Sequence, residues 1–189
     1  YFNLCDGTED EDSPGIEVIH ALEAAKVPFA GASSESYEPT RLEMKKACKK
    51  LGIATPKYIF AKNDADIEKA VKRLRFPLFV KHHNSYASVD ISRRSKVMTP
   101  EGLRIQAQKI ISRHGQALIE EFIEGKECTV LIAENPKNPK KPITYPPAQY
   151  NFPEGDSFKH SDLKWVDYSG LSAVKVEDPV LSKRLQDES

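Results

Sequence analysis

The chain has 189 residues, 39% of them hydrophobic, which is enough for one good core or two small lobes rather than several domains. Basic and acidic residues both number 28, so the formal charge is zero, and this excludes a nucleic acid or membrane partner held by a global basic field. Three cysteines without CxxC spacing (Cys5, Cys48, Cys128) predict free thiols in a reducing compartment and no zinc site. No apolar run reaches about 18 residues, so we expect no membrane span and a cytoplasmic location.

Residues 1–37 predict the tail of an open-sheet N-terminal domain. The opening Tyr1-Phe-Asn-Leu predicts the end of a buried strand, and an acidic loop leads into an amphipathic helix near residues 15–26. Val27-Pro-Phe-Ala-Gly31 predicts a short strand closed by glycine. This strand–helix–strand order is typical of an α/β unit.

Residues 38–134 alternate helices with strands and predict an α+β lobe, so the fold class expected for the whole chain is α/β with α+β lobes. Pro39 suits a helix N-terminus, and Gly52 stops that helix. The elements expected next are a strand at Tyr58–Ala61, a helix over 64–74, a strand over 77–81, a polar loop over 82–90, a helix over 100–112 and two paired strands around Gly125.

Residues 135–189 predict the start of a second lobe. Prolines are frequent there, a strand is expected over 143–152, and a helix is expected to begin at Pro179. Between them lies a loop over 154–162 that is long enough to carry function.

The stretch 117–130 is an apolar strand that ends in acids, turns at Gly125 and restarts. It predicts a hairpin with Glu120 and Glu127 on either side of the turn, where a flat polar ring with nearby hydroxyls could bind. The alternative is a pair of solvated acids that guard a sheet edge. Lys81 ends another apolar strand, where its charge could meet phosphate, although a lysine can also simply extend from a strand end to solvent.

Two other charged or polar clusters predict no metal site. His82 and His83 are adjacent and have no third ligand at a suitable spacing, so we expect them to be hydrogen-bonded or solvated. The acidic run 9–12 lacks the EF-hand pattern, so we expect a solvated loop.

Several motifs taken in order carry a family resemblance. They are Arg41-x-x-x-Lys45, Gly52-Ile-Ala-Thr-Pro56, Pro77-Leu-Phe-Val-Lys81, Ser88 and Glu120-Glu-Phe-Ile-x-Gly-x-Glu127. Together they cover about two-thirds of the chain, and the set resembles the ATP-grasp enzymes, most closely those of the D-alanine:D-alanine ligase type.

The resemblance implies an ATP site on the lobe predicted over residues 38–134. Lys81 would hold the α- and β-phosphates of ATP, Glu120 would accept from the adenine amino group, and Glu127 would bind the ribose hydroxyls. The adenine would lie beside Phe122 and pair with the backbone of Glu121 and Ile123. Arg41 stands where the family has a phosphate-binding lysine.

The resemblance also implies catalytic residues near the phosphates. Ser88 would help to place phosphate or substrate. The segment Phe158-x-x-x-Asp162-Leu-Lys-Trp165 is similar to the family's mobile loop, so Lys164 would bind phosphate and Trp165 would stand in place of a tyrosine. A chance Lys-Trp pair in a polar loop is the alternative.

The sequence departs from the family pattern at two places. The loop 82–90 contains no glycine, and Tyr86 and Asp90 fall where glycines would let backbone N–H groups approach phosphate. Each adds a side chain that could block that approach. Cys5-Asp6-Gly7 stands where the ligases have His-Gly near the first amino acid, so a substrate other than D-alanine is an alternative.

The implied function is an ATP-dependent carbon–nitrogen ligase that acts on a small amino acid or other carboxylate through an acyl phosphate. Magnesium is the implied metal, with ligands expected beyond Ser189, so we expect this chain alone to be inactive. The resemblance further implies a homodimer. A catalytically inactive nucleotide-binding or interaction module remains the alternative from another class.

Overall fold

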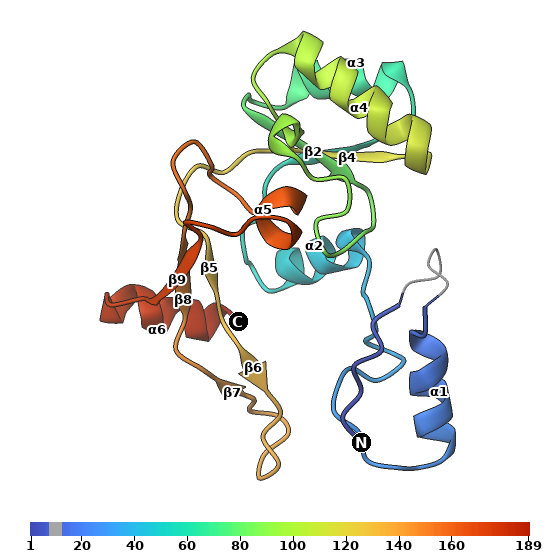
Figure 1. The fold of residues 1–189 in the computed structure, drawn as a ribbon, viewed down its shortest axis with the longest axis vertical. Helices are drawn as coiled ribbons and strands as arrows, with labels where there is room; N and C mark the ends of the chain where they lie inside the picture. Colours follow the sequence, from blue (N-terminus) through green and yellow to red (C-terminus); the bar gives the residue numbers. More distant parts are fainter. Residues whose placement is uncertain (8–12) are drawn as a thin grey trace. The chain divides into compact units, whose positions relative to one another are not determined.

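The computed structural model describes residues 1–7 and 13–189 (Figure 1). The acidic run 9–12 lies outside the described residues. The chain divides into two units, Tyr1–Cys48 and Lys49–Ser189, which we describe in turn.

The first unit contains helix α1 (Ile16–Ala24) and most of helix α2 (Arg41–Lys50). Helix α1 lies within the predicted range and buries Ile19. The two strands expected on either side of it are reduced to one parallel bridge between Phe2 and Ala30. Phe2 is 79% exposed, so the prediction of a buried strand at residues 1–4 is wrong, because a single bridge brings no neighbouring sheet to cover the side chain.

The second unit begins with a four-stranded antiparallel sheet backed by two helices. The strands β1 (Tyr58–Ala61), β2 (Leu78–His82), β3 (Lys96–Val97) and β4 (Ala117–Glu121) lie in the order β1-β4-β2-β3. Figure 1 shows helices α3 (Asp64–Arg73) and α4 (Pro100–His114) over one face of this sheet. A short 3₁₀ helix, η1 (Arg93–Ser95), precedes β3.

Local sequence signals explain where α4 begins and ends. The Thr99 side chain accepts a hydrogen bond from the Gly102 N–H, and Pro100 occupies the first turn, where its missing N–H costs nothing. Gly115 ends the helix with a φ of 72°, a left-handed conformation that glycine adopts without strain. The helix therefore runs two residues beyond the predicted end at 112.

Strand alternation divides the sheet into a core face, covered by α3 and α4, and an opposite face without these helices, here called the open face, on which Leu118 and Glu120 are also buried. On β2, Leu78, Val80 and His82 are buried, while Phe79 and Lys81 are partly exposed. Ile119 of β4 pairs with Val80, so it shares the helix-covered face. The core behind this face comprises Ala61, Ile67, Ala70, Leu74, Leu78, Val80, Val97, Leu103, Ala107, Ile110, Ala117 and Ile119.

The rest of the second unit forms a smaller sheet, an arm and two helices. The strands β5 (Cys128–Thr129), β8 (Ala148–Asn151) and β9 (Ser172–Lys175) lie in the order β5-β8-β9. Strands β6 (Ile132–Ala133) and β7 (Ile143–Thr144) pair as a narrow arm. Helices α5 (Ser161–Trp165) and α6 (Pro179–Glu188) complete the unit, the latter beginning at the predicted Pro179.

Prolines explain why the strand predicted over 143–152 is two strands. Pro146 and Pro147 separate β7 from β8, and proline has no N–H to donate to a sheet ladder. Strand β9 was not predicted.

The expected hairpin around Gly125 is wrong. Strand β4 pairs with β1 on one edge and β2 on the other, which leaves no edge for β5. Strand β5 pairs instead with β8. The segment 122–127 is therefore a link between two sheets rather than a tight turn.

The cysteines and the helices of the described residues bear on two of the sequence predictions. All three cysteines are free thiols. No helix in residues 1–7 and 13–189 has the length and apolar character needed to span a membrane.

Candidate functional site

The open face of the helix-backed sheet carries a nearly buried ion pair. Lys81 on β2 and Glu120 on β4 lie on this face because alternation points their neighbours Val80 and Ile119 into the core. The Lys81 Nζ lies 2.6 Å from Glu120 Oε2, and the two side chains are 17% and 8% exposed. A carboxylate so little exposed requires a cation or hydrogen-bond donors, so this pair concentrates charge at a defined point of the sheet.

Aromatic side chains lie beside the ion pair. Phe79 pairs with Glu120 across the strands, and its ring centroid lies 5.8 Å from that of Phe122 and 4.9 Å from that of Phe158. Phe158 belongs to the segment after β8, so this segment covers part of the open face. These three rings, of which Phe158 meets the other two edge to face, form an apolar wall, an environment that favours a flat heteroaromatic ring.

A second lysine borders the aromatic wall. The Lys96 Nζ lies 4.2 Å from the Phe122 ring centroid and 2.6 Å from Glu124 Oε1. A cation over a ring face is attracted by the ring quadrupole. Lys96 therefore places a cation, paired with Glu124, beside the aromatic wall at the start of the link between the sheets.

The backbone just beyond β4 includes the N–H of Ile123, which differs from the two N–H groups before it. The Glu121 N–H donates to the Lys57 oxygen at 3.0 Å, and the Phe122 N–H donates to the Pro77 oxygen at 2.9 Å. None of the described residues accepts a hydrogen bond from the Ile123 N–H. Ile123 is 63% exposed, so the residue itself lies at the surface of the described structure.

Glu127, at the other end of the link, also meets a lysine. The Lys159 Nζ lies 3.4 Å from Glu127 Oε1 and 3.0 Å from the Tyr150 ring centroid. The Tyr150 N–H donates to the backbone carbonyl oxygen of Glu127 at 2.9 Å, which fixes the backbone of Glu127 beside β8. Glu120 and Glu127 thus stand at opposite ends of the link, each with a lysine partner.

The glycine-free loop keeps glycine-like backbone conformations. Ala87, Ser88 and Asp90 have φ values of 52°, 64° and 53°. Aspartate tolerates the left-handed region better than most residues, which explains how it can stand at a glycine position. The loop therefore turns sharply without glycine.

The Asp90 side chain is directed to the end of α4. Its Oδ1 lies 2.6 Å from Arg113 Nη1, and its Oδ2 lies 2.6 Å from His114 Nε2. The hydrogen bond from His114, and then the charge of Arg113, lower the pKa of Asp90. The carboxylate predicted to obstruct the loop instead anchors it.

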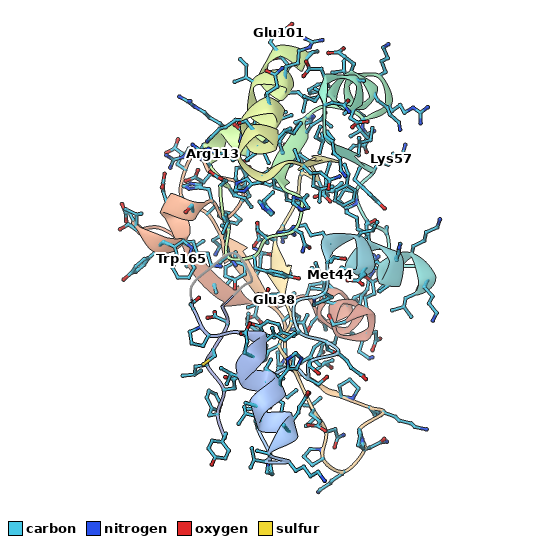
Figure 2. All side chains as sticks on the ribbon, turned by 90° about the vertical axis from the view of Figure 1, so that its right-hand side faces the viewer. Glu38, Met44, Lys57, Glu101, Arg113 and Trp165 are labelled. Carbon is cyan, nitrogen blue, oxygen red and sulfur yellow. The ribbon has the colours of Figure 1, made fainter. Side chains whose placement is uncertain are left out.

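Ser88 and Trp165 come together in this structure. The Trp165 Nε1–H donates to the Ala87 oxygen at 3.0 Å, and the Ser88 hydroxyl donates to the Lys159 oxygen at 3.4 Å. Lys164 is exposed on α5 next to Trp165, which Figure 2 labels. The loop 83–92 and the segment 156–165 therefore touch, as two parts of one site would.

Some predicted residues are not part of this group. Arg41 lies on the first turn of α2, in the first unit. His82 and His83 stack at 4.6 Å; the His82 Nδ1 accepts from the Asn84 N–H, and the His83 Nδ1 contacts the Gln116 oxygen. The described residues contain no group of three or more His, Cys, Asp or Glu that could hold a metal.

Sequence reasoning missed several residues that the fold brings to the site. Phe79 carried a usable signal, because it stands two residues before Lys81 on a predicted strand. Lys96 carried none, because its place opposite Phe79 depends on the pairing of β2 with β3, a strand that was not predicted. Lys159 and the contacts of Phe158 carried none, since they depend on how the segment after β8 folds over the first sheet.

The fold is similar to that of solved D-alanine–D-alanine ligases. The family model described as the D-ala D-ala ligase C-terminus matches residues 47–152, and the chain belongs to this family. The predicted family resemblance and the α/β fold class are therefore confirmed.

Individual relatives agree with this assignment. The chain is 28% identical over 171 residues to a D-alanine--D-alanine ligase of Ectopseudomonas mendocina. The matched region covers 89% of this chain and 51% of the relative. D-alanyl-alanine synthetase A of Vibrio cholerae has a TM-score of 0.70 at 21% identity, over 92% of this chain and 54% of that one. A Bacillus anthracis D-alanine--D-alanine ligase complexed with ATP has a TM-score of 0.63 at 19% identity, over 90% and 51%. The chain thus spans about half the length of the curated relatives it matches.

Proposed function

We propose that this chain is the ATP-binding portion of an ATP-dependent carboxylate–amine ligase. The observation that carries the proposal is the Lys81–Glu120 ion pair with the aromatic wall beside it, together with the Ile123 N–H just beyond the end of β4. A donor, an acceptor and a flat apolar surface are what an adenine ring requires. Family membership and the ATP bound to a structural neighbour support the same ligand.

In this proposal each residue has a part in holding ATP. Glu120 accepts from the adenine amino group, the Glu121 and Ile123 backbone pairs with the ring edge, and Phe122 lies beside the ring. Glu127 exchanges Lys159 for the ribose hydroxyls. Lys81 and Lys164 neutralise phosphate charge, which is the main way proteins assist phosphoryl transfer.

The proposed reaction has two steps. A substrate carboxylate oxygen attacks the γ-phosphorus, which breaks the bond to the β-phosphate oxygen and releases ADP. An amine then attacks the acyl carbon, loses a proton and expels inorganic phosphate, so that an amide forms. Ser88 and Trp165 help to place the transferred phosphate and the substrate.

The substrate is proposed only as a class, an amino acid or another small carboxylate. The described residues offer no metal site, so no step is assigned to magnesium here. A homodimer is likewise expected from the resemblance. A nucleotide-binding module without catalysis is the second candidate, and the glycine-free loop is the observation that favours it.

Calorimetry of ATP binding by the chain and its variants tests the proposal. We expect Lys81→Ala and Glu127→Ala each to weaken binding by about tenfold or more, because each removes a charge-assisted contact. The matched controls Lys72→Ala and Glu101→Ala change exposed residues on the helices behind the sheet and should bind like the wild type. Absence of ATP binding by the chain and by a longer form of the protein would contradict the proposal.

A ligase and a binding module are then distinguished by turnover. Release of ADP and phosphate that depends on an added amino acid, in the longer form, supports the ligase. Binding without release across a panel of amino acids supports the module.

A further inference from the structure

Asp156 is a buried carboxylate that the proposed ATP site does not use. Its side chain is 3% exposed, and Arg93 holds it in a fork, with Nε 2.8 Å from Oδ1 and Nη2 2.9 Å from Oδ2. A paired fork of this kind fixes orientation as well as charge. Arg93 directly follows the loop 83–92, whereas Asp156 begins the segment that leads to α5.

His160 connects this ion pair to α5. Its side chain is 2% exposed, its Nε2 lies 3.2 Å from Asp156 Oδ1, and its Nδ1 accepts from the Leu163 N–H at 3.1 Å. Because Nδ1 accepts, the proton of the neutral ring lies on Nε2 and is donated to Asp156. One imidazole thus both caps α5 and ties it to Asp156.

Three further hydrogen bonds join the same two segments. Trp165 donates to the Ala87 oxygen, the Ser88 hydroxyl donates to the Lys159 oxygen, and the Ser161 N–H donates to the Ile91 oxygen at 2.9 Å. Helix α5 has only five residues, too short to be stable without tertiary contacts. Its position therefore depends on what holds it to the loop.

We propose that Arg93, Asp156 and His160 are positioning residues that hold α5, with Lys164 and Trp165, against the loop 83–92. The proposal rests on the proposed function, since it gives Lys164 its place near phosphate. Of these three residues, His160 also lies edge-to-face against Phe158 of the aromatic wall, with ring centroids 6.1 Å apart. They act by keeping the segment 156–165 docked, so that the lysine is in place when the nucleotide binds.

The single tryptophan of the chain provides a direct readout. Trp165 lies on α5 and bonds to the loop, so time-resolved fluorescence anisotropy reports docking on the nanosecond scale. We expect Arg93→Gln to raise the amplitude of fast Trp165 motion by about twofold or more. Arg94→Gln, an exposed arginine one residue away, is the matched control and should leave it unchanged.

A second variant separates capping from docking. His160→Asn keeps a side chain that caps helices well, but asparagine is too short to cap α5 and reach Asp156 together. We expect His160→Asn to raise Trp165 mobility as Arg93→Gln does. Wild-type mobility in both variants would overturn the proposal, because capping alone would then be sufficient to place α5.

Measuring ATP affinity in the same variants connects the docking of α5 to the ATP site. It also distinguishes failure of the positioning role from failure of the proposed ATP-binding function. If Arg93→Gln leaves only one tenth of the molecules docked, the apparent affinity falls about tenfold, in proportion to the competent fraction. Mobile Trp165 with unchanged ATP affinity would overturn the positioning role while leaving the ATP site intact. Absence of ATP binding in every form, with the expected Trp165 changes, would reject the proposed function and confirm only the docking. A urea unfolding curve for each variant checks that the sheet remains folded.

Discussion

Strands β4 and β9 of the same unit differ sharply in burial. Four of the five residues of β4 are buried, whereas all four residues of β9 are exposed. Strand β4 is bonded on both edges and covered by α3 and α4, while β9 is an edge strand bonded only to β8. The comparison indicates that the helix-backed sheet supplies most of the stability of this unit, and that the smaller sheet depends mainly on its backbone hydrogen bonds.

The proposed ATP site includes residues from the helix-backed sheet and from the less buried part of the unit, so its two halves differ in how firmly they are held. Lys81 and Glu120 project from the well-packed sheet, so their geometry is set by the core behind them. Glu127, Lys159 and Lys164 belong to the less buried part. Segments with few buried contacts open at a lower free energy than a core, so this half is the one able to adjust to a ligand.

The strongest test of the comparison is a substitution that creates a cavity in the core of the helix-backed sheet. Ile119 is fully buried on β4, and Ile119→Ala should lower the free energy of unfolding by about 2–5 kcal/mol. Urea denaturation followed by circular dichroism measures the change. A loss below about 1 kcal/mol would mean that this sheet is not the stabilising region.

A smaller effect is expected where the loop 83–92 is anchored to α4. The folded-state pKa of Asp90 is lowered, so its contribution to stability is present above its unfolded pKa and is lost as the pH falls through the folded value. Asp90→Asn keeps a residue that tolerates the left-handed backbone but removes the charge. We expect it to cost no more than about 1 kcal/mol at neutral pH, the range for partly exposed ion pairs.

The measurement for Asp90 is a series of unfolding curves below and above about pH 4, near the unfolded pKa of aspartate. The difference between the wild type and Asp90→Asn should shrink at the acid end. A difference that stays constant with pH would show that the carboxylate charge does not hold the loop.

The smallest effect is expected on β9. Val174 is 44% exposed, and Val174→Ala should change the free energy of unfolding by less than about 0.5 kcal/mol. The same urea experiment serves here, with Ile119→Ala beside it. A loss comparable to that of Ile119→Ala would remove the distinction between the two sheets.

Local signals were enough to predict most elements of the helix-backed sheet. The strand Tyr58–Ala61 was predicted with its observed bounds, and α3 and α4 were placed to within two residues, because caps and apolar periodicity mark them. The hairpin at Gly125 failed for a reason outside its own sequence. Which strand pairs with β4 depends on β1, nearly 60 residues earlier in the chain, and no turn signal records that competition.

The site was predictable only where a family motif or strand alternation marked it. The motif pointed to Lys81, Glu120 and Glu127, whose roles in ATP binding stay predictions, although the expected tight turn between the acids is absent. The Asp90 contacts show the opposite case. Its residue type suggested an obstruction, and only the position of Arg113 and His114 reveals that the side chain turns towards α4.

The β6–β7 arm has a practical consequence for work with this protein. Figure 1 shows it extending from the smaller sheet, and its tip closes on itself through a hydrogen bond from the Asn135 side chain to the Lys141 oxygen. The exposed tip residues 136–142 contribute nothing to the core, and such tips tolerate insertions well. An affinity tag or a dye-labelling sequence inserted after Asn138 would therefore immobilise or label the molecule while leaving both sheets and both chain ends unmodified.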